Sequence, residues 1–191
     1  MKRGIDFVLA VVCLVIFSPL MAFCAIAIKR EDGLPVIYSQ ERIGRHGKPF
    51  MIYKFRTMKK DAEDGGIPKL VEMPNDPRLT HIGALLRKHH LDELPQLLNV
   101  VKGDMAFTGP RPERKYYIDR IMQYDPRYEQ LYALRPGVTS YATLYNGYAD
   151  TMEKMLRRLD LDLFYLHHHS LWMDASILFK TFLNIVSGKV F

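Results

Sequence analysis

Residues 7–28 read FVLAVVCLVIFSPLMAFCAIAI and contain no charged side chain. As an α-helix that rises about 1.5 Å per residue, this segment would extend about 33 Å, enough to cross the apolar core of a bilayer. It is longer than the apolar region of most signal peptides, and no convincing small-residue cleavage site ends it. We therefore expect a membrane anchor rather than a cleaved signal peptide.

The path of this anchor depends on Ser18-Pro19 and on the charges at its flanks. Proline lacks a backbone donor and crowds the preceding turn, so the pair predicts a kink in the helix. Lys2-Arg3 precedes the segment and Lys29-Arg30 follows it, so the positive-inside tendency draws both ends toward the cytoplasm. A re-entrant helix that enters and leaves by one face and a kinked single span both stay open on these residues.

Length and charge limit the class of protein. The chain of 191 residues suits one domain, and 48% hydrophobic residues suffice for a packed core. The 27 Lys and Arg outnumber the 21 Asp and Glu, giving a net charge of +6, which favours an anionic partner such as a membrane surface, a nucleotide or a nucleic acid. Cys13 and Cys24 both lie in the apolar segment, so neither a disulfide framework nor a thiolate metal site is expected, and the globular part is expected in the cytoplasm.

The region after the anchor predicts a β-hairpin. Residues 36–38 and 50–55 have strand character, and a turn region from Gly44 to Pro49 joins them. Residues 59–77 are polar and rich in Gly and Pro, which predicts a surface loop able to close over a ligand. Helices are expected downstream at residues 82–89, 92–101, 113–123, 126–134 and 151–166.

The C-terminal residues 176–186 predict an amphipathic helix. Ile177, Leu178, Phe182 and Ile185 fall near one face, and such a stripe either lies on a bilayer or, more commonly, packs in the core. The sequence as a whole predicts a mostly helical α+β fold with a short hairpin and surface amphipathic helices.

The acid pair Asp92-Glu93 is the main candidate for chemistry. Neighbouring helical residues point about 100° apart, so one carboxylate can face a phosphorus atom while the other binds a metal. Pro95 is tolerated in a first helical turn, which places both acids near a helix N-terminus, where the macrodipole favours their ionised, nucleophilic forms. The alternative is that Asp92 only caps a helix and Glu93 is an ordinary first-turn acid.

A carboxylate that attacks a phosphate meets a repulsion of about 4 kcal/mol per pair of unit charges at roughly 4 Å and an effective dielectric of about 20. Several basic residues could offset it: Lys54, Arg56, Arg78, Arg87, Arg111 and Arg135. Arg111 is the most suggestive, because prolines on both sides hold its backbone extended and less freedom is lost when its guanidinium grips a phosphate. Mg²⁺ held by oxygen ligands and a diphosphate would supply the remaining compensation.

Other patterns are weaker. The adjacent histidines at 89–90 and 167–169 fan out around a helix, unlike the wider spacing typical of zinc ligands. Asp160-Leu161-Asp162 resembles the acid-x-acid pattern of metal-dependent nucleotide-sugar glycosyltransferases, although capping or solvated acids explain most such matches. The tyrosines between residues 116 and 132 have a helical spacing that favours packing over base stacking, so no nucleic-acid partner is expected.

Taken in order, these motifs resemble the bacterial sugar transferases, also called monotopic phosphoglycosyl transferases. The resemblance covers nearly the whole chain and rests on stretches that share order and spacing: residues 54–58, 76–78, 86–88, 91–96, 99–100, 103–105, 109–112, 135–139 and 162–165. Together with Ser18-Pro19, it favours the re-entrant helix. The short length is similar to the minimal family form, with a re-entrant membrane helix at residues 1–30 and a cytoplasmic phosphoglycosyl transferase domain at residues 31–191.

The resemblance implies transfer of a sugar-1-phosphate from a UDP-sugar to a polyprenyl phosphate such as undecaprenyl phosphate, with release of UMP. The reaction would start glycoconjugate assembly at the cytoplasmic face of the bacterial inner membrane. By likeness, Asp92 would attack the β-phosphorus and carry a covalent phosphosugar, and Glu93 would help to hold Mg²⁺. The substrate-binding set would be Lys54, Arg56, Arg78, Arg87, Arg111, Arg135 and Asp162. Two kinds of protein partner stay open: a second copy of the chain in a homodimer, and later glycosyltransferases of the pathway.

The chain also departs from the family pattern. His89-His90 replaces a Thr-Ser that precedes the acids in many members, Thr139-Ser140-Tyr141 replaces Thr-Gly-Trp, and Tyr148 stands where an arginine is common. These positions bear on sugar or nucleotide recognition, so the donor sugar stays open. Two other classes also stay open: a glycosyltransferase that uses Asp160 and Asp162 and releases UDP, and a noncatalytic membrane-anchored scaffold.

Overall fold

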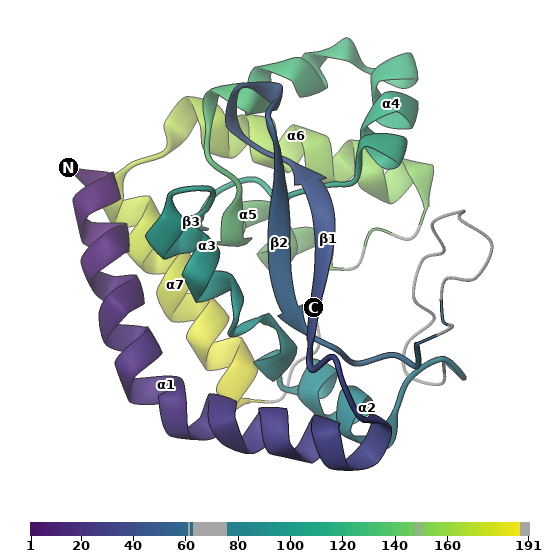
Figure 1. The fold of residues 1–191 in the computed structure, drawn as a ribbon. Coiled ribbons are helices and arrows are strands. Elements are labelled where there is room, and N and C mark those ends of the chain that lie inside the picture. The colour runs from purple at the N-terminus through teal and green to yellow at the C-terminus, as the bar shows by residue number, and fades with distance from the viewer. Residues whose placement is uncertain (61, 63–75, 148, 150, 188–191) are drawn as a thin grey trace.

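The computed structural model describes residues 1–60, 62, 76–147, 149 and 151–187 (Figure 1). Most of the predicted loop over residues 59–77, and the departure at Tyr148, lie outside the described residues. The described part is mostly helical with two small sheets, which confirms the α+β class.

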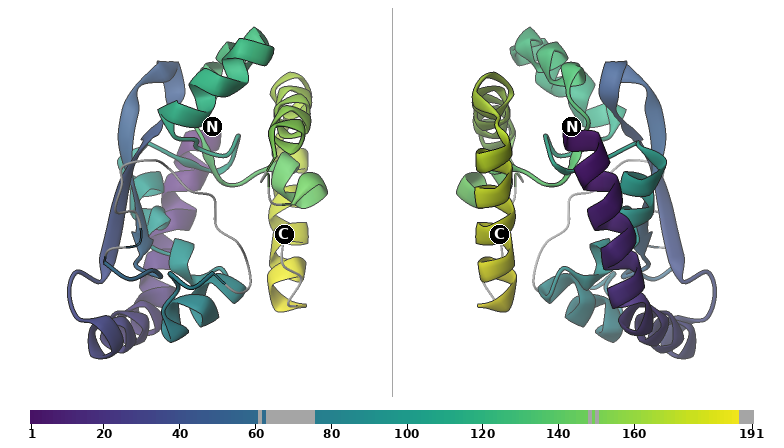
Figure 2. Two further views of the ribbon diagram at one scale, coloured as in Figure 1. Left: turned by 90° about the vertical axis from the view of Figure 1, so that its right-hand side faces the viewer. Right: turned by 90° about the vertical axis from the view of Figure 1, so that its left-hand side faces the viewer.

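The helices are α1 (Lys2–Asp32), α2 (His81–Lys88), α3 (Gln96–Lys102), α4 (Lys115–Tyr124), α5 (Tyr141–Asn146), α6 (Met152–His168) and α7 (Leu171–Val186). The 3₁₀ segments are η1 (Arg45–Gly47), η2 (Leu91–Glu93) and η3 (Pro126–Ala133). Strands β1 (Ile37–Ile43) and β2 (Pro49–Phe55) form the predicted antiparallel hairpin, and β3 (Ala106–Thr108) and β4 (Gly137–Thr139) form a parallel pair. Figure 2 shows the hairpin along one side of the molecule and α6 and α7 along the opposite side.

Helix α1 bends sharply near its middle, so that its second half runs across one end of the molecule (Figure 1). Pro19 lies inside this helix and has no N–H to donate. The hydroxyl of the preceding residue, Ser18, donates to the carbonyl of Val15 at 2.8 Å, a contact that often accompanies helix bending. The predicted kink is confirmed. Among the described residues, α1 is the one helix long and apolar enough to cross a membrane.

Both halves of α1 pack against the rest of the chain. Ala10 in the first half is fully buried against α3. Cys24 and Ile28 in the second half pack with Phe55 of β2 and Leu86 of α2. Many of the other apolar side chains of α1 face outward, as expected of a segment that meets lipid on its remaining surface.

The two ends of α1 are also bound by polar contacts. At the start of the helix, Lys2 pairs with Asp174 of α7 at 2.6 Å, and Arg3 donates to two carbonyl groups at the end of α3. At the other end, Arg56 pairs with Asp32 at 3.0 Å. Both ends of the helix therefore contact the same polar domain.

A side chain closes the open edge of the hairpin in place of a third strand. Asn99 of α3 is completely buried. Its Oδ1 accepts from the N–H of Tyr53 at 3.1 Å, and its Nδ2 donates to the carbonyl of Met51 at 2.7 Å. The amide thus makes the pair of bonds that a neighbouring strand would make to β2. This contact fixes α3, and the acid pair just before it, against the hairpin.

The end of β3 lies so close to β4 that side chains would not fit. A Cβ atom on Gly109 would lie 2.2 Å from the carbonyl oxygen of Arg135, and one on Gly137 would lie 2.2 Å from the backbone nitrogen of Gly109. Glycine permits this approach because it has no Cβ. The contact fixes the backbone two residues before Arg111.

Helices α4 and α6 pack with η3 around a separate apolar cluster: Tyr117, Ile118, Ile121, Tyr128, Leu131, Met155, Leu159 and Leu163. The packing predicted for the tyrosines is confirmed for Tyr117 and Tyr128. Tyr116 and Tyr124 are 41% and 68% exposed and do not belong to this core; for them the alternative of interfacial packing stays a prediction.

Several predicted elements differ in type or length. The helix expected at residues 92–101 begins only at Gln96, after η2, because Pro95 has no N–H for the bond that an α-helix would make there. Residues 126–133 are 3₁₀ rather than α-helical. Strands β3 and β4 were not predicted, since each has three residues and pairs with a distant partner.

Helix α7 begins at Leu171, earlier than predicted, and is only partly a core helix. Ile177 is buried, whereas Trp172, Phe179 and Phe182 are 84%, 63% and 61% exposed. The preference for core packing of this stripe is therefore wrong for Phe182. The helix keeps an apolar face without a partner in the described residues.

Asn99→Ala is expected to destabilise the fold, because it removes the hydrogen-bond partner of the N–H of Tyr53 and of the carbonyl of Met51. Each unpaired group costs about 1–3 kcal/mol, so the loss should be about 2–6 kcal/mol. Thermal unfolding in detergent should show a Tm lower by roughly 10 °C for a chain of this size. Asn184→Ala, at a part-exposed position on α7, is the matched control. A Tm of Asn99→Ala equal to that of the control would contradict the strand-like role of Asn99.

Candidate active site

The acid pair lies in the 3₁₀ turn η2, between α2 and α3. The preceding residue, His90, has φ 54°, a left-handed conformation that turns the chain out of α2. Asp92 is 5% exposed, and its Oδ1 atom has no hydrogen-bond partner in the described part of the chain. A buried carboxylate oxygen without a partner is costly in a folded protein. Such an orphan atom indicates a place where a ligand or a reacting group binds.

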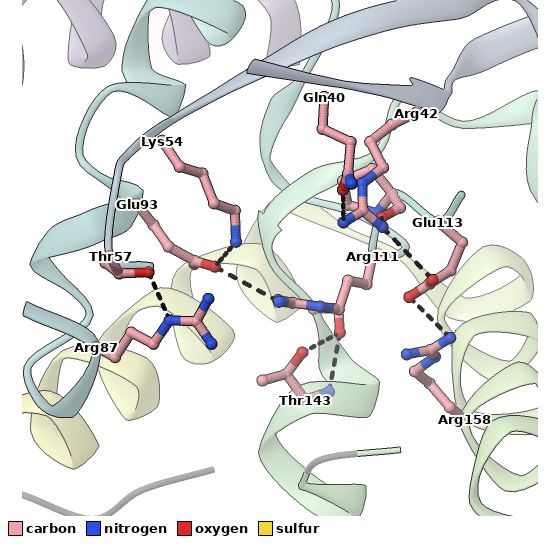
Figure 3. A network of polar contacts seen from close by, with 12 residues as sticks. Gln40, Arg42, Lys54, Thr57, Arg87, Glu93, Arg111, Glu113, Thr143 and Arg158 are labelled. Carbon is pink, nitrogen blue, oxygen red and sulfur yellow. Dashed lines mark hydrogen bonds and ion pairs between the residues drawn. The ribbon is translucent and has the colours of Figure 1, made fainter. Parts of the chain in front are cut away.

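Three cationic side chains from different elements lie around Glu93 (Figure 3). The Nζ of Lys54 on β2 lies 2.6 Å from Oε1 of Glu93, and Nη2 of Arg111, after β3, lies 3.5 Å from the same oxygen. Arg87 on α2 donates from Nε to the hydroxyl of Thr57 at 2.8 Å. These residues were predicted from sequence as a phosphate-binding set, and the structure brings them together with Asp92 and Glu93.

The position of Arg87 depends on a close backbone contact. A Cβ atom on Gly83 of α2 would lie 2.0 Å from the carbonyl oxygen of Thr57. The absence of a side chain lets α2 lie directly on the segment after β2. Arg87, one turn further along α2, then reaches the hydroxyl of Thr57. Lys54 and Arg87 are therefore held in a fixed relation to each other.

The pKa values of the two acids shift in opposite directions. Burial raises the pKa of Asp92, and although Lys54 and Arg87 lower it, the carboxylate of Glu93 adds to the rise. Burial would also raise the pKa of Glu93, but Lys54 and Arg111 outweigh it and hold that pKa far below its usual value. The expectation that a helix dipole favours ionisation of both acids is wrong for Asp92. The turn η2 has three residues and few aligned peptide dipoles, so burial dominates.

A metal would find few ligands from the protein alone. Among the described residues, no group of three or more His, Cys, Asp and Glu side chains could hold a metal ion. Mg²⁺ commonly binds one or two carboxylates together with substrate phosphates. Glu93 and the unpaired oxygen of Asp92 fit that pattern. The site suits Mg²⁺ as an ion shared with a bound diphosphate.

Three residues of the predicted substrate-binding set are engaged elsewhere. Arg56 binds the end of α1, where it donates to the carbonyl of Asp32 at 2.9 Å. Arg78 forms an ion pair with Asp76 at 2.6 Å. Arg135 donates from Nε to the carbonyl of Gly103 at 2.9 Å. These contacts use only part of each guanidinium group, and Nε and Nη1 of Arg56 have no partner in the described part of the chain. The substrate role of the three arginines stays a prediction.

Asp160 and Asp162 lie on different faces of α6. The side chain of Asp160 is 62% exposed and pairs with Arg127 at 2.9 Å, whereas Asp162 is 3% exposed. Two carboxylates that diverge in this way cannot hold one metal ion between them. The acid-x-acid motif at Asp160 and Asp162 therefore does not support the alternative of a metal-dependent glycosyltransferase.

Sequence reasoning missed a chain of charges behind Arg111. Glu113 lies 3.7 Å from Arg42 on β1 and 3.0 Å from Arg158 on α6 (Figure 3). The sequence carried one signal of it. Arg158 falls on the helical face of α6 that also carries the buried Met155 and Leu159, and a charged residue on a core face is usually paired.

Comparison with known proteins agrees with this geometry. The model of the bacterial sugar transferase family matches residues 1–188. A UDP-N-acetylgalactosamine-undecaprenyl-phosphate N-acetylgalactosaminephosphotransferase of Aeromonas hydrophila is 39% identical over 98% of this chain and 44% of its own length. A UDP-glucose:undecaprenyl-phosphate glucose-1-phosphate transferase of Escherichia coli is 39% identical over 95% of this chain and 39% of its own length.

The chain thus spans less than half the length of these two relatives. It matches 98% of the length of the exopolysaccharide production protein PSS of Rhizobium leguminosarum, at 38% identity over 100% of this chain. The family match extends from the bent apolar helix through η2 and the Pro-Arg-Pro segment to α7. The chain belongs to the bacterial sugar transferase family.

Proposed function

We propose that this protein transfers a sugar-1-phosphate from a UDP-sugar to undecaprenyl phosphate or a related polyprenyl phosphate and releases UMP. The observation that carries the proposal is the buried oxygen of Asp92, which has no hydrogen-bond partner in the described part of the chain. The next residue, Glu93, is held ionised by Lys54 and Arg111. A nucleophile beside a cluster of cations suits attack on an anionic phosphorus centre.

The relatives support the substrate classes. Their names specify UDP-N-acetylgalactosamine, UDP-glucose or a galactose phosphotransferase reaction, each with undecaprenyl phosphate. Because these relatives differ in the sugar, we extend to this chain only the class of donor and the acceptor. A panel of UDP-N-acetylgalactosamine, UDP-glucose and UDP-galactose is the natural donor set to test.

In the proposed first step, a carboxylate oxygen of Asp92 forms a bond to the β-phosphorus of the donor. The bond from that phosphorus to the oxygen bridging to the α-phosphate breaks, and UMP leaves with the electron pair. In the second step, a phosphate oxygen of the lipid attacks the same phosphorus and displaces the carboxylate. Asp92 is then free again, and the product is a polyprenyl-diphospho-sugar.

The surrounding cations make this attack feasible. Each contact between Asp92 and a phosphate charge costs about 4 kcal/mol at roughly 4 Å and an effective dielectric of about 20, so compensation must come from fixed positive groups. Lys54 and Arg111 already bind Glu93, and Arg87 lies close enough to lower the pKa of Asp92. Mg²⁺ bound by Glu93 and the diphosphate would polarise the phosphoryl oxygens.

Asp92→Asn should lose nearly all turnover, because an amide of almost the same shape is a far poorer nucleophile. Removal of an activated nucleophile usually lowers kcat by about 10⁴-fold or more. UMP release from a UDP-sugar measures this loss. Asp119→Asn, at an exposed pair with Lys115 on α4, is the matched control and should behave like the wild type.

The covalent step has its own signature. Wild-type protein incubated with labelled donor and no acceptor should release UMP and retain labelled sugar-phosphate on the peptide that contains Asp92. Direct attack by the lipid would require both substrates before any UMP forms. A labelled adduct on another residue, or substantial turnover by Asp92→Asn, would overturn the role of Asp92.

Removal of Mg²⁺ by a chelator should abolish UMP release, and added Mg²⁺ should restore it, because the charge on a diphosphate exceeds what the nearby cations offset. Glu93→Gln should raise the Mg²⁺ concentration needed for half-maximal rate and leave the site of covalent attachment unchanged. Full activity in excess chelator would contradict this part of the proposal.

We also propose that α1 is a re-entrant membrane anchor with both ends on the cytoplasmic face of the bacterial inner membrane. Its bend and the binding of both its ends to one polar domain support this arrangement. A straight span would carry one of those ends about 30 Å away, across the hydrocarbon core. The exposed apolar face of α7, with Trp172 and Phe179, offers a second contact with the bilayer surface.

Labelling with a membrane-impermeant maleimide tests the topology. In a background with Cys13 and Cys24 replaced, single cysteines at Gly4 and at Lys29 should react only from the cytoplasmic side. Both positions are exposed, and a side chain at Gly4 meets no neighbour. A cysteine at the exposed Glu129 on η3 marks the side of the domain, and one at Val15, near the bend, should resist labelling from either side. Labelling of Gly4→Cys and Lys29→Cys from opposite sides would refute the re-entrant arrangement.

A further inference from the structure

The segment of residues 110–113, which follows β3, is bound through its backbone at both ends. At its start, the carbonyl of Pro110 accepts a hydrogen bond from the N–H of Gly137 on β4 at 2.9 Å. At its end, the carbonyl of Glu113 accepts from the N–H of Ile43 on β1 at 3.1 Å. The segment is therefore held between two strands that belong to different sheets.

Arg42 adds a side-chain contact at the end of this segment. Its Nη1 donates to the carbonyl of Pro112 at 3.3 Å and lies 3.7 Å from Oε2 of Glu113. The other carboxylate oxygen of Glu113, Oε1, lies 3.0 Å from Nη2 of Arg158 on α6. One carboxylate thus joins β1, the segment and α6 in a network that we call the arginine clamp: Arg42, Glu113 and Arg158 (Figure 3).

Glu113 is suited to support the segment and not to bind substrate. It is 8% exposed, as is Arg158, and each of its carboxylate oxygens faces a guanidinium group. Burial would raise the pKa of Glu113, but Arg158 and Arg42 outweigh this effect and hold the pKa below its usual value. The carboxylate is therefore ionised near neutral pH. Loss of one partner would leave part of a buried charge uncompensated, which is costly.

Arg111 lies between the clamp and the acid pair. In Figure 3 its side chain points toward Glu93, and Glu113 lies on its other side. The Nη2 of Arg111 lies 3.5 Å from Oε1 of Glu93. The prolines on both sides of Arg111 fix their own φ angles and hold the residue before each extended, so the segment is stiff. A shift of its end at Glu113 is therefore transmitted to the guanidinium of Arg111.

We propose that Glu113 is a positioning residue: through its two arginine partners it fixes the segment against β1 and directs the guanidinium of Arg111 toward the donor phosphate. This inference rests on the proposed transferase function. Glu113 does not contact substrate in this role, and its effect on the reaction passes through Arg111.

Hydrogen exchange at the amide of Ile43 tests the clamp without any substrate, because this N–H donates to the carbonyl of Glu113. It can be followed by NMR on protein labelled with ¹⁵N-isoleucine in lipid nanodiscs. In the wild type the amide should exchange slowly. Glu113→Ala should raise its exchange rate at least about tenfold, since the segment loses its side-chain contacts with β1 and α6. Glu129→Gln, at an exposed position on η3, is the matched control and should leave the exchange rate unchanged.

The reaction provides the second measurement. If Glu113 acts through Arg111, Glu113→Ala should lower kcat/KM for UMP release by about 10- to 100-fold, as expected for a misplaced binding group. In an Arg111→Ala background the same change should cost less than about threefold, because no guanidinium is left to orient. A purely structural residue would cost the same factor in both backgrounds. Glu129→Gln should leave kcat/KM unchanged.

The outcomes separate the hypotheses. Unchanged exchange at Ile43 in Glu113→Ala, or equal losses of kcat/KM in the two backgrounds, would overturn the positioning role. If Glu113→Ala does not fold, Arg42→Gln decides, because it removes one partner of Glu113 and leaves the other in place. A loss of kcat/KM that disappears in the Arg111→Ala background supports the role, whereas no loss, or a loss that persists there, refutes it. Failure of the transferase proposal is seen separately, as no UMP release by the wild type.

Discussion

Two adjacent carboxylates share one buried turn, and the positive charge that they require comes from distant parts of the chain. Lys54 belongs to the hairpin, Arg87 to α2 and Arg111 to the segment after β3. No local motif could gather these cations, because a flexible chain would lose too much entropy in holding them against one another. The fold supplies the compensation through backbone contacts at Gly83 and Gly109, where any side chain would separate the elements.

The same arrangement joins the long apolar helix α1 to the site. The second half of α1 packs on Phe55 and Leu86, which lie within a few residues of Lys54 and Arg87. The first half packs on α3, which carries Asn99 and so fixes the hairpin edge. An anchor that spanned the bilayer in a straight line could not make both contacts. The bend at Ser18-Pro19 is therefore a requirement of the packing of α1 on the domain.

Much of this could be predicted from sequence because the signals are local. Short patterns predict the long apolar helix, its kink, the hairpin and the acid pair. The prolines around Arg111 predict a stiff segment. The parallel pair β3–β4 could not be predicted, since each strand has three residues and its partner lies about thirty residues away in the sequence.

The arginines show a second limit of sequence reasoning. Arg56 and Arg111 both belong to the substrate-binding set predicted from sequence, yet one binds the end of α1 and the other faces the acid pair. The partner of a long cationic side chain depends on tertiary packing, which a motif does not encode. Arg158 and Glu113 were missed for the same reason, since their pairing joins α6 to the segment after β3.

The departure of His89-His90 from the family pattern affects the backbone just before the acid pair. His90 adopts a left-handed conformation that directs the chain from α2 into η2, a backbone state in which histidine is one of the enriched residues other than glycine. Its ring lies close enough that a positive charge on it would lower the pKa of both Asp92 and Glu93. A hydroxyl residue at this position would carry no such charge. Position 90 therefore bears on the electrostatic surroundings of both acids, and not only on the path of the backbone.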